Sequence, residues 1–318
     1  MQLRKFLKFG LAAIAIVTAL SACGGNDDDD HPAGPGNIAE VAKDKGFNAL
    51  LAAVTKAGIG GTLTDANAQL TVFAPTDQAF TDLAKQLGFA DANAMVTALP
   101  ASALQSILTY HVLGTKKLAA DLISGGPTQT TAYSFANTPT KLNFDFTSGV
   151  KITDAALTVA TVVTPNVPAS NGVIHAIDKV LVPPGVLNVV QMAQVNPTFS
   201  SLVGAVVKAN LQGTLSGAGP FTVFAPTNAA FTVAPQNLTV PQLTTVLTYH
   251  VLASQVLSTQ IPFGTPVATV AMQNITITAG TPPTIKDATA VQAKIVAVDV
   301  RASNGVIHVI DKVLIPAL

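Results

Sequence analysis

Three sequence blocks that each occur twice are the strongest constraint on what this chain can fold into. The pairs are LTVFAPTDQAF at 70–80 with FTVFAPTNAAF at 221–231, LTYHVL at 108–113 with LTYHVL at 247–252, and ASNGVIHAIDKVLVP at 169–183 with ASNGVIHVIDKVLIP at 302–316. The blocks keep their order, and their offsets are 151, 139 and 133 residues. Solenoid repeats are far shorter, about 20–50 residues. The pattern therefore predicts two tandem globular domains, copy one at residues 37–183 and copy two at residues 186–318.

The changing offsets show where the two copies differ. Copy two is shorter by 12 residues between its first and second blocks and by a further 6 between its second and third blocks. The total length of 318 residues suffices for two domains of ordinary size. Because 49% of the residues are apolar and only 11% are charged, both copies can build a core.

The apolar residues are mainly aliphatic, since aromatic residues make up 5% of the chain and Trp is absent. Cores rich in Val and Ile are typical of strands. The formal net charge is zero, and Arg occurs only as Arg4 and Arg301. A nucleic-acid partner is not expected, because such binding requires clustered basic residues.

Each copy begins with helical patterns and continues with strand patterns. In copy one, Asn37 is expected to cap a helix from Ile38 that stops at Gly46, and a second helix follows to Gly58. A strand at 71–74, a helix from Thr76 to about Leu87 and a helix from Pro100 into Tyr110 come next. Thr- and Val-rich segments with frequent turn residues then predict further strands. The pattern predicts an α+β fold with a largely antiparallel sheet.

The N-terminal segment has the three parts of an export signal. Arg4, Lys5 and Lys8 precede an uncharged, mainly apolar run at 9–20, which is too short for a stable membrane span. The sequence Leu-Ser-Ala-Cys at 20–23 then resembles the lipobox of bacterial lipoproteins. That resemblance implies that a signal peptide at 1–22 is removed and that Cys23 is lipidated and inserts into membrane lipid. An ordinary cleaved signal with an incidental cysteine is the alternative.

Residues 23–36 are expected to form an acidic flexible tether, because Gly, Pro and four consecutive Asp residues prevent a regular element. A calcium site at Asp27–Asp30 is the alternative to a solvated acidic run. Several acyl chains at Cys23 would give durable anchoring. Gly24 is not the Asp that resembles an inner-membrane retention signal, so the outer membrane or cell surface is the expected location.

The duplicated blocks resemble the fasciclin domain. The resemblance lies in the TVFAPT-[DN]-x-AF run, in the Tyr-His pair after a helix and in the final NGVIH-x-ID-x-VL-x-P run. It covers about residues 37–183 and 186–317. It implies that each copy is a roughly seven-stranded β-sandwich or wedge flanked by helices. It also implies a non-enzymatic adhesion or surface-interaction role in a secreted or lipid-anchored protein.

The residues that bear chemistry give little support to an enzyme, and no catalytic residue, cofactor or metal site is predicted. The chain has no G-x-S-x-G, no phosphate-binding loop motif and a single Glu, Glu40. The histidines of the two copies are the remaining candidates: His111, His175, His250 and His308. Buried structural histidines are the favoured interpretation, and metal, catalytic or surface-binding use are the alternatives. In a regular strand His175 and Asp178 face opposite ways, which argues against a His–Asp dyad.

The third block is interpreted as a structural motif. Asn171-Gly172 and Asn304-Gly305 precede the last strand of each copy, and they predict a tight hairpin turn in which glycine adopts a positive φ. His175 and His308 lie within that strand and are assigned to the same motif.

Candidate partner-binding residues come from the resemblance alone. Adhesive animal members of the family are linked to integrins through an Asp-Ile pair before the last block and through the Tyr-His region. The matching residues here are Asp299-Val300, Tyr110-His111 and Tyr249-His250. Copy one has Asn166-Val167 instead of the acidic pair, so copy two is the favoured binding domain.

The sequence therefore predicts a lipid-anchored adhesion protein whose partner is a surface protein, a polysaccharide or another matrix polymer. A structural or accessory envelope lipoprotein with a membrane-protein partner is the alternative. A small-ligand or metal-binding module that uses the paired histidines is a further alternative.

Overall fold

The computed structural model describes residues 34–235 and 237–317. Four predictions, the signal peptide at 1–22, the lipidation of Cys23, the acidic run and most of the tether at 23–36, lie outside these residues.

Seven helices build the helical part of copy one. They are α1 (Ile38–Asp44), α2 (Asn48–Ala57), α3 (Gly60–Thr64), α4 (Asp77–Gln86), α5 (Ala92–Ala98), α6 (Ala101–Tyr110) and α7 (Ala119–Ser124). Asn37 caps α1, where its Oδ1 accepts from the backbone N–H groups of Ala39 and Glu40. The Thr76 hydroxyl caps α4 by accepting from Ala79 N. Both caps satisfy N–H groups that a helix leaves without partners at its start.

Copy two repeats this order, with several elements shorter than their counterparts. Its helices are α8 (Val189–Val195), η1 (Pro197–Phe199), α9 (Ser200–Lys208), α10 (Gln212–Leu215), α11 (Asn228–Thr232), α12 (Val240–Tyr249) and η2 (Ser258–Gln260). Helix α11 has five residues, whereas its counterpart α4 has ten. The described residues between α11 and α12 contain no counterpart of α5, which accounts for most of the 12-residue deletion.

Each copy contains one seven-stranded sheet with the same topology. The strands of copy one are β1 (Leu70–Pro75), β2 (Val112–Leu113), β3 (Thr128–Phe135), β4 (Thr138–Asp145), β5 (Lys151–Thr153), β6 (Val159–Ala169) and β7 (Gly172–Ile177), in the sheet order β2-β1-β7-β6-β5-β4-β3. The first long strand, β1, pairs in parallel with the last, β7, and the other pairs are antiparallel. The prediction of a largely antiparallel α+β fold is confirmed.

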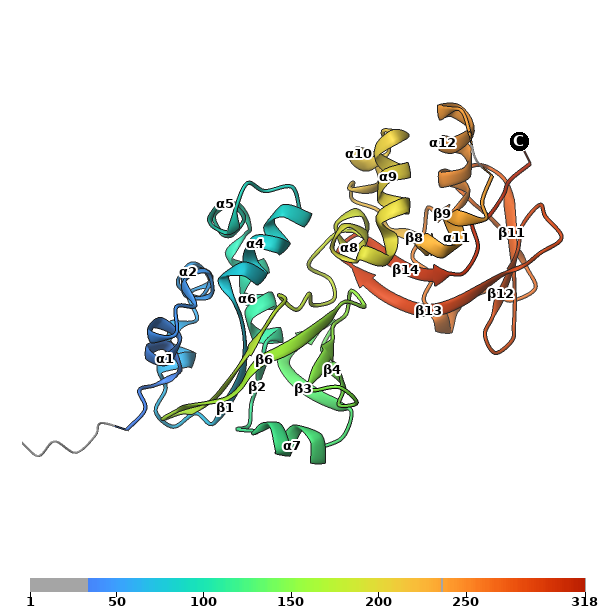
Figure 1. Ribbon diagram of the computed structural model, residues 1–318. Helices are drawn as coiled ribbons and strands as arrows, with labels where there is room; N and C mark the ends of the chain where they lie inside the picture. The colour runs from blue at the N-terminus through green and yellow to red at the C-terminus, as the bar shows by residue number, and fades with distance from the viewer. Residues whose placement is uncertain (1–33, 236, 318) are drawn as a thin grey trace, which may run out of the picture. The chain divides into compact units, whose positions relative to one another are not determined.

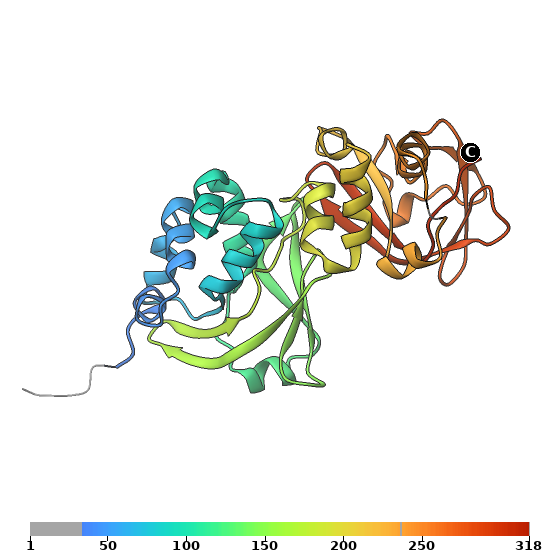
Figure 2. The same cartoon turned by 45° about the horizontal axis from the view of Figure 1, so that its top comes forward.

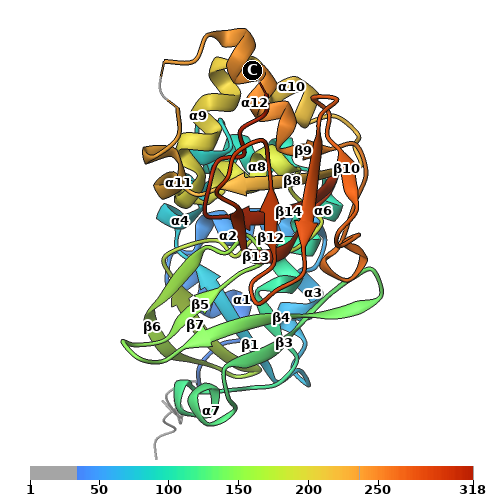
Figure 3. The same ribbon diagram turned by 90° about the vertical axis from the view of Figure 1, so that its right-hand side faces the viewer.

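In copy two, β8 (Phe221–Pro226) and β14 (Gly305–Ile310) form the same parallel pair. The remaining strands are β9 (Val251–Leu252), β10 (Pro266–Ala268), β11 (Asn274–Thr278), β12 (Thr284–Lys286) and β13 (Ala293–Ala302). Figure 3 looks toward copy two and shows β14 between β13 and β8.

The central strands serve two cores, because successive side chains point to opposite faces of a sheet. Ile174 and Ala176 of β7 pack in the core on the helical side, whereas Ile177 packs with Phe73 and Leu142 in the core enclosed by the sheet. Every residue of β7 is buried as a result. In Figures 1 and 2 the helices of copy one, from α1 to α6, gather on one side of β1 and β6. Each copy is thus a seven-stranded wedge flanked by helices, as predicted.

Candidate functional site

His111 and His250 end α6 and α12 and are buried, each with 2% of its surface exposed. The Nδ1 atom of each lies 2.7 Å from a carbonyl one helical turn earlier, that of Ile107 or Val246. The Nε2 atom accepts from the backbone N–H of Leu181 or Leu314 at 2.9 and 2.8 Å. Burial lowers the pKa of both rings to about 4, so both are neutral near pH 7. These rings join a helix end to the segment after the last strand.

His175 and His308 occupy equivalent positions in β7 and β14 and are fully buried. Each ring stacks on a phenylalanine of the neighbouring strand, Phe73 or Phe224, with centroids 5.7 Å apart. The Nε2 atoms lie 2.9 Å from the carbonyls of Lys117 and Val256. Burial lowers the pKa of both. Asp178 instead accepts from Thr161 N at 2.6 Å, so it forms no dyad with His175.

Tyr110 and Tyr249 are also buried, with 1% of each residue exposed. Their hydroxyls donate to the carbonyls of Lys141 and Asn274 at 3.3 and 2.8 Å. A partner cannot reach the two Tyr-His pairs in this structure, so their prediction as binding residues needs correction. The motif recurs because it packs the helix end against the sheet, and its signal in the sequence is one of folding.

Asn171 and Asn304 use every hydrogen-bonding group of their side-chain amides to join three segments. The Oδ1 atom of Asn171 accepts from Ile38 N at 2.9 Å, and its Nδ2 donates to the carbonyls of Leu63 and Asp65 at 2.9 and 3.0 Å. Asn304 does the same with Val189 N and with the carbonyls of Leu215 and Gly217. The structural interpretation of this motif agrees with these contacts.

The reason for glycine at positions 172 and 305 differs from the predicted one. Neither residue has a positive φ. A Cβ atom at Gly172 would lie 2.2 Å from the carbonyl oxygen of Leu70, and one at Gly305 would lie 2.3 Å from that of Phe221. The hairpin itself is present, since Ala169 pairs with Gly172 across the turn. Glycine is required because the first strand of the copy passes so close to its last strand.

Asp299 lies in a bulge of β13 with φ of 59° and is half-buried. Its carboxylate accepts from the backbone N–H and from the hydroxyl of Ser258, at the start of η2. In copy one Asn166 has φ of 60°, and its Oδ1 accepts from Ala119 N at the start of α7. Asn and Asp tolerate this left-handed conformation better than most residues. Val300, the second residue of the pair, is 4% exposed.

Two exposed valines precede Asp299 in β13. Val296 and Val298 are 55% and 42% exposed, and their spacing of two residues places them on one face of the strand. The matching residues of copy one are Val163, which is 53% exposed, and Pro165. Copy two has an exposed apolar strip, defined as Val296 and Val298, that ends one residue before Asp299.

A buried carboxylate in each copy was missed by the sequence reasoning. Asp154 accepts from three backbone N–H groups and from the Thr158 hydroxyl, and burial raises its pKa to about 6. Burial by itself also raises the pKa of the equivalent Asp287. Hydrogen bonds from Lys312, Thr289 and Ile315 outweigh this effect, so the pKa of Asp287 is lowered. The Lys312 Nζ lies 2.5 Å from Asp287 Oδ2. The recurring Ile-x-Asp-Ala at 152–155 and 285–288 is the signal that could have revealed this pair.

Within residues 34–235 and 237–317, no three His, Cys, Asp or Glu side chains gather as a set of metal ligands. In the same residues no helix is long and apolar enough to cross a bilayer. The ring nitrogens of His111, His175, His250 and His308 lie within hydrogen-bonding distance of backbone groups.

Comparison with known proteins gives matches to both copies. The family model of the fasciclin domain matches residues 45–183 and 197–316. Protein sll1483 of Synechocystis sp. is 41% identical over 142 residues, which cover 42% of this chain and 75% of the relative.

Two further matches extend over both copies. Transforming growth factor-beta-induced protein ig-h3 of Sus scrofa is 30% identical over 254 residues, which cover 77% of this chain but only 34% of that protein. Among solved structures, a domain pair from the insect cell adhesion molecule fasciclin I aligns with 87% of this chain and 98% of its own, with a TM-score of 0.42 and 18% identity. Because the family model covers more than half of the residues, the chain belongs to the fasciclin domain family and carries two such domains in tandem.

Proposed function

We propose that this chain is a non-enzymatic adhesion protein, held at the cell surface by lipid on Cys23, that binds a surface protein or an extracellular polymer through copy two. Proteins with fasciclin domains are cell-adhesion and interaction modules and are generally not enzymes. The lipid anchor and the outer-membrane location rest on the N-terminal sequence, residues 1–24.

The exposed apolar strip beside Asp299 is the observation that carries the choice of copy two. Apolar side chains grouped on an exposed strand face are suited to a protein or polymer partner. Each Asp299 oxygen accepts one hydrogen bond from Ser258 and retains further acceptor capacity. The proposed contact face therefore combines Val296, Val298 and the Asp299 carboxylate.

A surface-attachment assay tests this proposal. In a strain that lacks the native gene, the Val296→Ser/Val298→Ser protein should restore no more attachment than an empty vector. The matched variant in copy one, Val163→Ser, should restore attachment fully. Equal attachment by the double variant and the unchanged protein would contradict the proposed face.

The role of the carboxylate can be separated from folding. Asn166 shows that an amide fits this bulge and caps the start of α7, so Asp299→Asn should keep the fold and its stability. We expect this variant to lower attachment, because it removes the charge alone. If crosslinking instead finds one stoichiometric envelope partner and attachment never depends on the chain, the accessory-lipoprotein alternative is favoured.

A further inference from the structure

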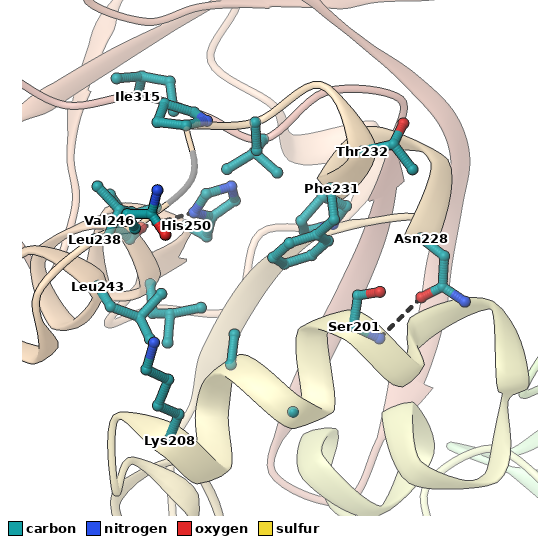
Figure 4. A pocket seen from close by; sticks show the side chains of 18 residues that line it. Ser201, Lys208, Asn228, Phe231, Thr232, Leu238, Leu243, Val246, His250 and Ile315 are labelled. Carbon is teal, nitrogen blue, oxygen red and sulfur yellow. Dashed lines mark hydrogen bonds between the residues drawn. The ribbon is translucent and has the colours of Figure 1, made fainter.

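Copy two contains a cavity of about 530 Å³ between α9, α11, α12 and the segment after β14. Figure 4 shows Phe231 on one side, Leu243, Val246 and His250 on the other, and Lys208 at one end. The volume lies within the usual range for small-molecule sites, about 300–1,000 Å³. Leu238, Val313 and Ile315 add to an apolar wall.

The internal duplication explains why this space is open. Helices α9, α11 and α12 correspond to α2, α4 and α6. The hydrogen bond from Ser201 N to Asn228 Oδ1 (2.9 Å) repeats the bond from Ala49 N to Asp77 Oδ1 (2.8 Å). In copy one α5 packs against α2 and α4 and buries Met95 and Val96. Because the described part of copy two has no such helix, the matching surfaces of α9 and α11 border a cavity.

Equivalent side chains on these helices are more exposed in copy two than in copy one. Phe80 of α4 is 2% exposed, whereas its counterpart Phe231 is half-buried. Ala53 of α2 is fully buried, whereas its counterpart Ala205 is partly exposed. The surface that belongs to a helical core in copy one is thus an accessible apolar wall in copy two.

The charge of the cavity comes from one lysine. In copy one the Lys56 ammonium donates to the carbonyl of Thr97, near the end of α5. The counterpart Lys208 lacks that acceptor, and within the described residues no hydrogen bond or ion pair involves its ammonium. Lys208 is the sole Lys, Arg, Asp or Glu among the described residues that line the cavity.

Two other polar side chains of the wall, His250 and Asn228, are engaged within the fold. Both ring nitrogens of His250 are hydrogen-bonded within the fold, at 2.7 Å to Val246 O and 2.8 Å to Leu314 N. The Asn228 amide donates to Pro197 O and Ser200 Oγ in addition to accepting from Ser201. An apolar wall with one cation at its end is complementary to a molecule with an alkyl body and one anionic end.

We propose that this cavity is a binding site for an amphipathic monocarboxylate of the fatty-acid class, with the alkyl chain against Phe231 and Leu243 and the carboxylate at Lys208. The site is independent of the exposed apolar strip on β13, so the two proposals can fail separately.

Calorimetric titration of the purified protein with decanoate, below its critical micelle concentration, tests the site. We expect saturable binding of one decanoate per chain. Decan-1-ol should bind about tenfold more weakly, because it lacks the charge-assisted contact with the ammonium. Decyltrimethylammonium should show no saturable binding.

Two pairs of variants locate the binding. Gly204 lines the cavity, and an added Cβ there meets no atom within 4 Å, so Gly204→Leu should fill the space and abolish binding. Gly213→Leu places the same side chain in open space outside the cavity and should bind normally. Lys208→Met should reduce decanoate affinity to that of decan-1-ol, whereas Lys56→Met in copy one should not.

Circular dichroism and thermal melting establish that each variant is folded. The absence of saturable decanoate binding would overturn the proposal. Unchanged decanoate binding by folded Gly204→Leu, or by folded Lys208→Met, would overturn it as well.

Discussion

At the scale of single residues, each Asn-Gly pair needs its glycine because a neighbouring strand leaves no room for a Cβ atom. The Leu70 carbonyl occupies the place that a Cβ of residue 172 would need. Backbone atoms cannot move aside as the end of a long side chain can. The same constraint acts at Gly305 in copy two, which explains why the pair recurs.

Gly172→Ala should therefore destabilise copy one by roughly 2–4 kcal/mol, in the range of overpacking and strain. Gly114→Ala is the matched control, because its Cβ would meet nothing within 4 Å and its φ is not positive. Urea unfolding, followed by circular dichroism, measures both. A Gly172→Ala midpoint equal to that of Gly114→Ala would show that the strands can separate at little cost.

Residue-level reasoning from the sequence was accurate where a contact is local. The Asn37 and Thr76 caps were predicted, because each cap acts on backbone groups two or three residues away. The burial of Asp154 and the bulge at Asp299 were not predicted. Each depends on at least one partner far along the chain, Val182 for Asp154 and Ser258 for Asp299.

At the scale of elements, the two copies should respond differently to acid. The folded-state pKa of His250 is lowered to about 4, so its contribution to stability is complete above about pH 6.5 and is lost as the pH falls. The pKa of Asp287 is lowered too, so this group gives no gain in acid. In copy one His111 behaves like His250. The pKa of Asp154 is raised, however, so this residue changes the stability in the opposite direction as the pH falls. The contribution of Asp154 to the stability of copy one grows as the pH falls from about 6 toward 4.

We therefore expect copy two to lose more stability than copy one between pH 7 and pH 5. Hydrogen exchange followed by mass spectrometry, corrected for intrinsic exchange rates, resolves the two copies in one sample. Peptides from β11–β13 should lose more protection than peptides from β4–β6. Equal losses in the two copies would show that the Asp154 and Asp287 environments do not set the acid response.

Helix α5 shows why some elements escaped the sequence reasoning. Its seven residues, ANAMVTA, lack a clear apolar period, and only Met95 and Val96 of them are buried. The longer helices α2, α4 and α6 have ten residues each and a regular apolar face, so they were predicted close to their observed bounds. The described part of copy two has no counterpart of this least predictable helix, and the cavity that results was therefore not predicted.

At the scale of the whole molecule, attachment to a membrane is proposed to depend on one atom, the sulfur of Cys23. Cys23→Ser removes the thiol that a lipid thioether requires. We expect this chain to leave the detergent-soluble envelope fraction, while the two fasciclin domains keep their fold. Immunoblots of membrane and soluble fractions measure the change, and Ser21→Ala, which leaves the thiol in place, serves as the control. Retention of the Cys23→Ser chain in the envelope would point to a different anchor.

The parallel pairing of the first and last long strands determines how each domain can fold. Leu70 of β1 is in register with Gly172 of β7, and Phe221 of β8 with Gly305 of β14. Contacts between such distant positions raise the contact order, and proteins dominated by them fold slowly. During synthesis, β1 has only the two residues of β2 as a neighbour until β7 emerges. Each domain is therefore completed at its last strand, and a nascent chain that ends before residue 172 lacks the centre of its own sheet.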